Sequence, residues 1–382
     1  MNNIIPARIT EARESRALSM ADLADLLGVT RQAISKYERG IMNPSMDSIQ
    51  LLSHKLKIPI DFFYKANVGT VAYGSSIFFR ANLNIAKKIK TACKYQVKWI
   101  DEIKGYLESF VDFPDREILP PTEDYESLSF EEIEQIALDL RARWGLGDRP
   151  IGDLIGILEN HGIVVSQFAG NEFCSFKGID AFSCWRSGSP YILYNPSQKS
   201  AVRIRFSILH ELAHLLFHSD IPEDDAVKKT IVELTDNQAD RFAAAFLLPA
   251  TSFPKDVRGT SLSALEPVKL KWGASFSTII RRCETLDILT DNQINYLKRQ
   301  MTMQKFWHKE PLDDTMIVKG PEIIKDALLM LDENGVVSKD EFLLQTSLNS
   351  EEVEKMCFLP RGYFGQQNIR QKPVLKLVSS VV

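Results

Sequence analysis

The sequence feature that most constrains the fold is an apolar run at residues 203–218, RIRFSILHELAHLLFH, which contains the pattern H-E-x-x-H. Residues four positions apart lie on one face of an α-helix, so the rings of His210 and His214 can bind one zinc ion. Glu211 then lies where its carboxylate can take a proton from a zinc-bound water. Burying three polar side chains in an apolar helix is costly without such a partner. The run therefore predicts a metal-binding helix, and a buried helix with hydrogen-bonded histidines is the alternative.

A zinc site needs a third protein ligand, and the next apolar run, TDNQADRFAAAFLLP at residues 235–249, supplies candidates. Asp236 and Asp240 are four positions apart and share a helix face. We expect Asp236 to bind the metal and Asp240 to orient a ligand histidine through its other ring nitrogen. Glu233, one turn earlier, is the alternative ligand. His218 is excluded, because a continuous helix carries it about 12 Å along the axis from His210.

A second pattern lies near the N-terminus, in SMADLADLLGVTRQAISKYERG at residues 19–40. Ser19 can cap a first helix and Thr30 a second. Gly28 permits the left-handed backbone that ends the first helix. Two short helices joined by such a turn can place the second in a DNA major groove. The residues that we expect to contact DNA are Thr30, Arg31, Gln32, Ser35 and Lys36. A plain helical hairpin with a solvated outer face is the alternative.

The amino-acid sequence of this segment is similar to that of a known family. QAISKYERG, followed by NPSMDSIQLLSHKLKIPIDFF, resembles the Xre family of phage-repressor-like DNA-binding domains. The resemblance covers residues 7–64 and implies a five-helix fold that binds a double-stranded DNA operator. It also implies a homodimer, and two copies matter because one such helix contacts few base pairs.

Charge and composition divide the rest of the chain. Residues 80–98 hold six basic and no acidic residues, whereas residues 101–134 hold twelve acidic and two basic residues and contain the proline-rich stretch FPDREILPPTEDYE. The basic run has loose helical spacing and could contact DNA phosphates, form a solvated helix face or fold against the acidic segment. We expect four regions: a DNA-binding domain at 1–66, a basic helix and acidic linker at 67–128, a metal-binding domain at 129–252, and a helical C-terminal region at 253–382. The last would pack as helices or form a sensor or partner surface.

The periodicity after residue 129 predicts a mainly α protein with a small β-sheet, an α+β fold. We expect helices at 130–144, 151–161, 200–217 and 228–248, and strands at 163–168, 176–185 and 191–194. A strand edge beside the metal helix, from 176–185 or 191–194, could pair with an extended peptide. Tyr191, Tyr194 and Arg203 are candidates, by proximity in the sequence alone, for stabilising an oxyanion. Arg205 and Arg203 are more simply explained as structural.

The metal-binding region also resembles a known family. RIRFSILHELAHLLFH followed by DNQADRFAAAFLLP is similar to the ImmA/IrrE family of metallopeptidases. Members carry H-E-x-x-H and then a glutamate three residues before the alanine of an A-[ND]-x-F-A-A stretch. That alanine is Ala239 here, so Asp236, which is one methylene shorter, takes the place of the glutamate. The resemblance covers about residues 130–250 and implies a zincin-like fold with Zn²⁺ as cofactor.

Composition excludes several classes of protein. The net charge is −4, which argues against a wholly basic nucleic-acid binder but not against a local DNA-binding module. Five scattered cysteines without a C-x-x-C pair indicate neither a disulfide framework nor a cysteine zinc knuckle. The N-terminus has no secretory h-region, and no run is long and apolar enough to span a membrane. We therefore expect a cytoplasmic protein.

Together these features predict a DNA-binding transcription regulator fused to a zinc-dependent endopeptidase that cleaves a repressor, a partner protein or itself. In the expected mechanism His210, His214 and Asp236 bind Zn²⁺ and Glu211 is the general base. The alternative is a repressor or antitoxin-like autoregulator whose peptidase fold is an inactive scaffold that senses a ligand or partner. A zinc hydrolase acting on a non-peptide substrate is a third hypothesis.

Overall fold

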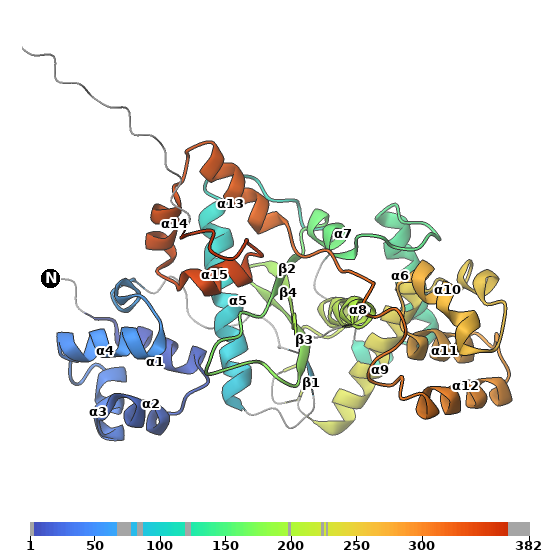
Figure 1. Ribbon diagram of the computed structural model, residues 1–382, viewed down its shortest axis with the longest axis horizontal. Coiled ribbons are helices and arrows are strands. Elements are labelled where there is room, and N and C mark those ends of the chain that lie inside the picture. The colour runs from blue at the N-terminus through green and yellow to red at the C-terminus, as the bar shows by residue number, and fades with distance from the viewer. Residues whose placement is uncertain are drawn as a thin grey trace, which may run out of the picture.

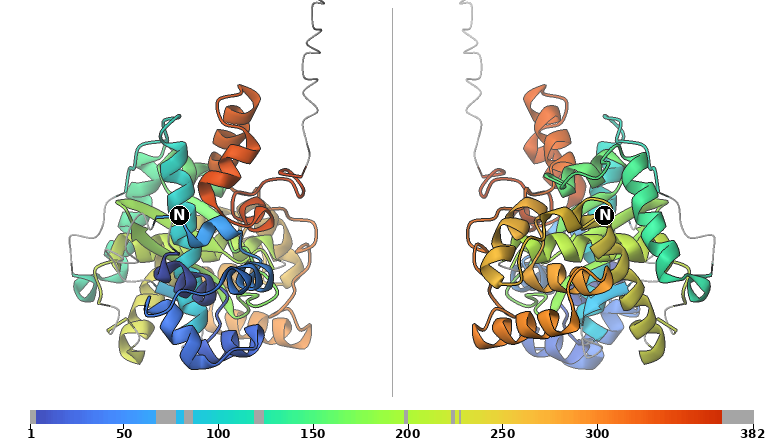
Figure 2. Two further views of the ribbon diagram at one scale, coloured as in Figure 1. Left: turned by 90° about the vertical axis from the view of Figure 1, so that its left-hand side faces the viewer. Right: turned by 90° about the vertical axis from the view of Figure 1, so that its right-hand side faces the viewer.

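The structure is a computed structural model that describes residues 4–66, 78–81, 87–118, 124–197, 200–222, 225–226 and 228–365. Its long axis joins two helical ends, as Figure 1 shows. The N-terminal helices lie at one end and helices α10–α12 at the other, so each set faces the viewer in one panel of Figure 2. A four-stranded β-sheet lies between them.

The N-terminal head consists of short helices. They are α1 (Pro6–Ser15), α2 (Met20–Leu27), α3 (Arg31–Glu38), α4 (Met46–Leu56) and the 3-10 turn η1 (Ile60–Phe63). Of these, α2, α3 and α4 have side-chain N-caps. Ser19 forms a capping box with Asp22, and the hydroxyl of Thr30 accepts a hydrogen bond from the Ala33 N–H. Gly28 has a φ of 66°, the left-handed conformation that ends α2. The capping and turn predictions are confirmed, with a 3-10 turn in the fifth position.

The sheet has the strand order β1-β3-β4-β2. Its strands are β1 (Phe78–Ala81), β2 (Val164–Gln167), β3 (Ile179–Arg186) and β4 (Ser189–Tyr194). β3 pairs antiparallel with both β1 and β4, and β4 pairs in parallel with β2. Three of the strands match sequence expectations; β1 was not expected. The fold is therefore the predicted mainly α protein with a small mixed sheet.

The sheet separates two hydrophobic cores. Side chains alternate along a strand, so Tyr191 and Leu193 enter one core while Ile192 and Tyr194 enter the other. The first core joins the head, helix α5 (Lys87–Leu107) and one sheet face. The second lies on the opposite face, where α8 (Ala201–Phe217) contacts β1, β3 and β4. Both faces are buried, which explains why the strand sequences lack a regular polar alternation.

The second core is completed by helices on either side of α8. They are α6 (Phe130–Arg143), α7 (Leu154–Asn160), α9 (Lys229–Leu247), α10 (Leu262–Trp272), α11 (Phe276–Thr285) and α12 (Asp291–Met303), with the 3-10 turn η3 (Phe253–Asp256). A further 3-10 turn, η2 (Tyr125–Ser127), precedes α6 and has no buried residue. The helices after residue 320 instead pack against α5 and β2 in the first core. They are α13 (Ile323–Glu333), α14 (Lys339–Thr346) and α15 (Ser350–Met356). The region after residue 253 is thus helical as expected, and it divides between the two cores.

The basic run at 80–98 ends inside the protein. Lys98, near the middle of α5, is fully buried, and its ammonium lies 2.6 Å from Glu11 of α1. Glu11 also accepts hydrogen bonds from Arg8 and from the indole N–H of Trp99. This contact with the head was not among the three alternatives for the run. Lys98 also lies 3.7 Å from Glu102, which belongs to the acidic segment. All five cysteines are unpaired and buried. None of the described helices is long and apolar enough to cross a membrane.

Candidate functional site

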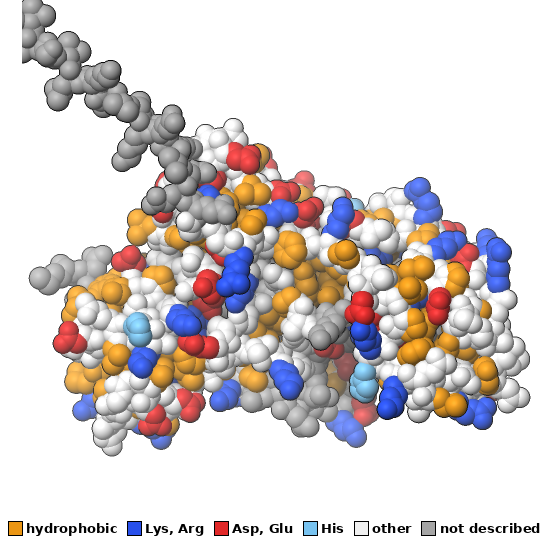
Figure 3. All heavy atoms as spheres, in the orientation of Figure 1, with side chains coloured by type: hydrophobic (Ala, Val, Ile, Leu, Met, Phe, Trp, Pro, Cys, Tyr) orange, Lys and Arg blue, Asp and Glu red, His pale blue; other side chains and the backbone are white. Residues whose placement is uncertain are grey.

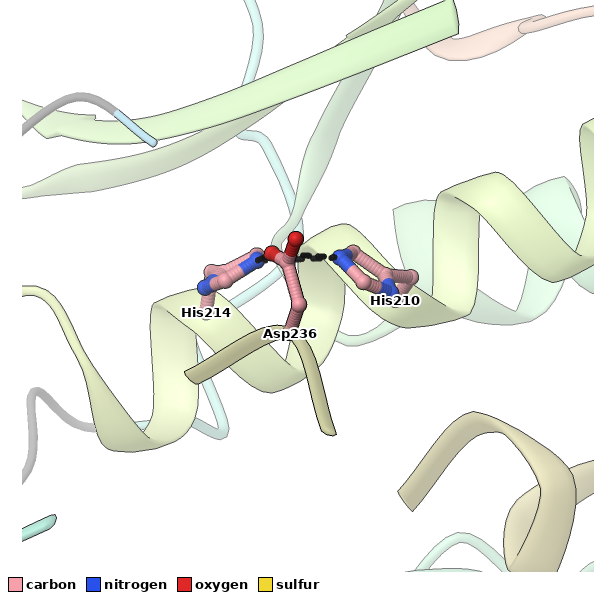
Figure 4. A group of neighbouring side chains, drawn as sticks. All are labelled: His210, His214 and Asp236. Atoms are coloured by element: carbon pink, nitrogen blue, oxygen red, sulfur yellow. Dashed lines mark hydrogen bonds and ion pairs between the residues drawn. The ribbon is translucent and has the colours of Figure 1, made fainter. Parts of the chain in front are cut away.

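The two histidines of H-E-x-x-H lie one turn apart on α8, and both are buried. Their Nε2 atoms are 3.1 Å apart. Asp236 extends from α9, the helix packed against α8, toward the same point, as Figure 4 shows. Its Oδ1 atom lies 3.7 Å from His210 Nε2 and 3.8 Å from His214 Nε2. The structure thus brings the three predicted ligands together.

His210 is oriented by a charged pair behind it. Its Nδ1 lies 2.9 Å from Asp240 Oδ1, so an Nδ1–H can donate to the carboxylate. The other oxygen of Asp240 accepts a hydrogen bond of 2.8 Å from Arg281 on α11. A carboxylate bound to Nδ1–H leaves the lone pair on Nε2, which points toward Asp236. The structure thus places Asp240 where we expected the residue that orients a ligand.

His214 is oriented by an uncharged chain of hydrogen bonds. The amide nitrogen of Gln238 donates to the carbonyl of Tyr125, so the amide oxygen of Gln238 must be the acceptor for His218 Nε2–H. His218 Nδ1 is therefore the acceptor for His214 Nδ1–H, at 2.9 Å. Burial lowers the pKa of His218 to about 4, which keeps this ring neutral. The lone pair of His214 is again left on Nε2.

The donor set fits a zinc ion. Four-coordinate zinc with bonds of about 2.0–2.2 Å needs donor atoms roughly 3.3 Å apart, close to the 3.1, 3.7 and 3.8 Å found here. The hydrogen bonds at the Nδ1 atoms of His210 and His214 direct both Nε2 lone pairs toward one point. The two lone pairs repel each other there, and a cation would relieve this repulsion. Asp236 is half exposed, with 50% of its side chain accessible, so a fourth position can be reached from solvent. Two imidazoles and one carboxylate are the ligand types of catalytic zinc sites.

Glu211 lies beside these ligands and is fully buried. Its Oε2 accepts a hydrogen bond of 2.8 Å from the hydroxyl of Ser183 on β3. The pleat of β3 explains the contact, because Ala181, Ser183 and Trp185 all face α8. A hydrogen bond from the sheet therefore helps to fix the carboxylate of Glu211, the candidate general base on α8.

The other candidates from the sequence lie elsewhere. Glu233 is exposed and pairs with Lys229, outside the ligand group. Arg203 donates to the carbonyl of Trp307, and Arg205 donates to the carbonyls of Ile151 and Gly152, so both have structural contacts. Of the two tyrosines expected as candidates to stabilise an oxyanion, Tyr194 lies in the same core as α8. Tyr191 faces away from α8 and donates to Asp101.

Sequence reasoning missed four residues of the site: Ser183, His218 as a partner of His214, Gln238 and Arg281. His218 is four positions after His214 and so shares its helix face, a spacing that was readable from the sequence. Ser183 and Arg281 come from other elements, and nothing in their local sequence marks them.

The helix expected to read DNA is α3. Thr30, Arg31, Gln32 and Lys36 are exposed and Ser35 is half buried, whereas Ile34 and Tyr37 pack inward. These five residues therefore share the solvent side of α3, at the end of the molecule away from α10–α12 (Figure 1). Elsewhere on the face in Figure 3, Lys and Arg side chains are interspersed with Asp and Glu, so charge there does not mark a single basic surface.

Comparisons with known proteins find two family models that match different parts of the chain. A family model described as helix-turn-helix matches residues 9–63, and one described as an IrrE N-terminal-like domain, of the M78 peptidases, matches residues 159–284. The chain therefore carries an Xre-like helix-turn-helix domain followed by an IrrE/ImmA-like domain. Both resemblances stated from the sequence are confirmed.

A curated relative is the SPbeta prophage-derived uncharacterized HTH-type transcriptional regulator YonR of Bacillus subtilis (strain 168). It is 38% identical to this chain over 58 residues, which are 15% of this chain and 54% of the relative. The chain thus spans about half the length of the curated relative that it matches.

Proposed function

We propose that this protein is a DNA-binding transcription regulator whose IrrE-like domain is a zinc-dependent endopeptidase. The observation that supports the enzymatic part is the convergence of His210, His214 and Asp236 beside the buried carboxylate of Glu211. Three ligands and an adjacent carboxylate are what metal-assisted hydrolysis of a peptide bond requires.

Each residue of the site has a distinct role in this proposal. His210, His214 and Asp236 would hold Zn²⁺, which supplies Lewis-acid activation of water and of a peptide carbonyl. Glu211 would accept a proton from the attacking water and pass it to the leaving amine. The hydroxyl of Ser183 holds one carboxylate oxygen of Glu211 and so limits its rotation.

The experiment combines metal content with hydrolysis. We expect elemental mass spectrometry to find one zinc per chain in the parent and in Glu211→Gln, and none in Asp236→Ala. Peptides prepared from a bacterial proteome should be cut by the zinc-loaded parent and not by Glu211→Gln, which keeps the ligands and removes the base. Equal hydrolysis by these two proteins would contradict the mechanism.

The alternative function is an autoregulator of the repressor or antitoxin type, in which the peptidase fold is an inactive scaffold. The observation that favours it is the short side chain of Asp236, whose oxygen lies farther from the two nitrogens than they lie from each other. Purified parent without zinc, prepared without chelator, would support this alternative.

The DNA-binding part of the proposal rests on the exposed side of α3. Arg31 and Lys36 can donate to guanine, and Gln32 can form a bidentate pair with adenine. We expect operator DNA selected from a random duplex pool to bind parent more tightly than Arg31→Ala by about 1–3 kcal/mol. Lys298→Ala, which changes a basic residue of α12 at the opposite end, is the matched control. Unchanged affinity of Arg31→Ala would exclude this side of α3 as the DNA contact.

We further propose a homodimer, since the head presents a single reading helix per chain. Selected operators should then contain two half-sites about one helical turn apart. Sedimentation of the protein with such DNA should give two chains per duplex, and one chain per duplex would contradict the dimer.

A further inference from the structure

Strand β1 lies outside the stretch matched as the IrrE-like domain, yet it completes that domain's sheet. The matched residues 159–284 contain β2, β3, β4, α8 and α9. Within that set β3 has a free edge, and Phe78–Ala81, from the segment between the head and α5, covers it. β1 also contacts α8, the helix of the two histidines.

The register brings β1 alongside the general base. Phe78 is paired with Ser183, whose hydroxyl holds Glu211, and the strand then runs antiparallel to β3 until Ala81 meets Ile179. The next residue of β3 after Ile179 is Asp180, which lines a pocket of about 480 Å³ between α8, α9, α11 and α12. Asp240 and Ser207 line the same pocket. β1 therefore runs from the strand position beside Glu211 toward the pocket that Asp240 and Ser207 line.

We infer that β1 is the peptide substrate of this site, bound in cis, so that the protein cuts the connection between its DNA-binding head and the rest of the chain. This inference rests on the proposed endopeptidase function and names its substrate. Main-chain pairing to a sheet edge holds an extended peptide without requiring a particular sequence, which is the binding mode that β1 shows. The register places the cut within residues 78–81, and the pairing of Phe78 with Ser183 puts the Phe78–Phe79 bond nearest to Glu211.

The chemistry is a hydrolysis without redox change. Water adds across the amide: its oxygen joins the carbonyl carbon of Phe78 as the C–N bond breaks, and Glu211 carries a proton from that water to the nitrogen of Phe79. The second proton of the water leaves the new carboxylic acid and is taken up by the new amine. The products are a chain that ends in a Phe78 carboxylate and one that begins with a Phe79 ammonium group.

Cutting β1 does not by itself release the head. Glu11 in the head remains bound to Lys98 on α5, and Arg16 remains bound to Glu352 on α15 through two hydrogen bonds of 2.7 and 2.8 Å. The two products must therefore be separated under denaturing conditions to be detected.

The first measurement follows the cut in the full-length protein. Chelator-treated parent is reloaded with one equivalent of zinc, incubated and analysed by denaturing intact-mass spectrometry. We expect two fragments from a cut within residues 78–81, at a rate independent of protein concentration, and no cut in zinc-loaded Glu211→Gln. In a mixture of the two proteins only the parent should be cut, because the substrate is in cis.

The second measurement does not depend on activity. Hydrogen exchange in Glu211→Gln should show protected amides in Phe78–Ala81. Successive N–H groups of a strand point to opposite sides, so only one of Phe79→Pro and Arg80→Pro should remove a hydrogen bond to β3 and most of this protection. The other variant is the matched control.

The outcomes separate the two proposals. A parent that cuts library peptides but stays intact, or is cut outside 78–81, keeps the endopeptidase function and overturns the cis substrate. Unprotected amides in β1 also overturn it. A zinc-loaded parent that cuts neither itself nor the library overturns both proposals.

Discussion

Two of the regions that bury charged side chains do so in different ways. Where the head meets α5, Glu11 is surrounded by donors from Arg8, Lys98 and Trp99, so the opposite charges compensate each other. At the ligand group, two imidazole nitrogens and a carboxylate oxygen point toward one another. The first arrangement is complete as it stands, whereas the second would be stabilised by a cation.

The comparison distinguishes a structural network from a binding site. A buried carboxylate that already accepts three hydrogen bonds fixes the position of the elements that supply them. In a binding site, acceptor atoms converge on one point and hydrogen bonds to the other side of each ring fix their orientation. This arrangement is unfavourable without a cation and needs little rearrangement to bind one. Changes in the first region should therefore alter stability, and changes in the second should alter metal affinity.

The largest expected effect is on stability, from Lys98→Met. Removing one partner of a buried ion pair costs about 3–5 kcal/mol. Arg8 stays beside Glu11 as a second cation, so we expect a loss at the lower end of this range. Urea unfolding should show this loss, while zinc content stays at the parent value. Lys57→Met is the matched control, because its pair with Glu172 is exposed and should contribute less than about 1 kcal/mol. Equal losses of unfolding free energy in the two variants would show that the buried ion pair contributes no more to stability than the exposed one.

A pH-dependent effect is expected at a third buried carboxylate, Glu159 of α7. It accepts hydrogen bonds from the N–H groups of Glu322 and Ile323, where α13 begins, and burial raises its pKa from 4.5 to about 7. The folded state then binds more protons than the unfolded state between pH 4.5 and 7, so stability falls as the pH rises through this window. The total loss is at most about 3 kcal/mol.

Glu159→Gln isolates this contribution, since an amide oxygen accepts the same hydrogen bonds and does not ionise. The free energy of unfolding of the parent relative to this variant should decrease from pH 5 to pH 8. A difference between the two proteins that does not change with pH would show that Glu159 does not titrate in this range.

A smaller effect is expected behind the ligands. Asp240→Asn keeps the shape of the side chain but weakens the acceptor for His210 Nδ1–H, and such changes typically lower metal affinity about 10–100-fold. Competition with a chelator of known affinity measures this change. Thermal unfolding of the zinc-free protein should change little. An unaltered zinc affinity would mean that Asp240 is not needed to orient His210.

The head was the most predictable part of the chain. Its signals are local: a capping serine, a glycine with positive φ and a capping threonine within a few residues define two helices and their turn. The same holds for α8 and α9, whose apolar spacing marks the faces on which His210, His214 and Asp236 lie. Helical geometry alone makes His210 and His214 neighbours on α8. It also places Asp236 on the apolar side of α9 that packs against α8.

The partners of these residues were not predictable in the same way. Ser183 reaches Glu211 from a strand and Arg281 reaches Asp240 from α11. β1 reaches β3 from the region in which a basic helix and an acidic linker were expected. Each contact joins elements that are distant in the sequence, and no local pattern encodes which distant element will pack nearby.

The sequence by itself therefore determined the two domain types, the expected ligands and the faces that carry them, because helix periodicity and capping act over a few residues. The tertiary structure alone decided that the sheet divides two cores, that Lys98 joins the head to α5 and that β1 covers the edge of β3. These features depend on burial of apolar surface and compensation of charge among elements far apart in the chain, which only the folded molecule brings together.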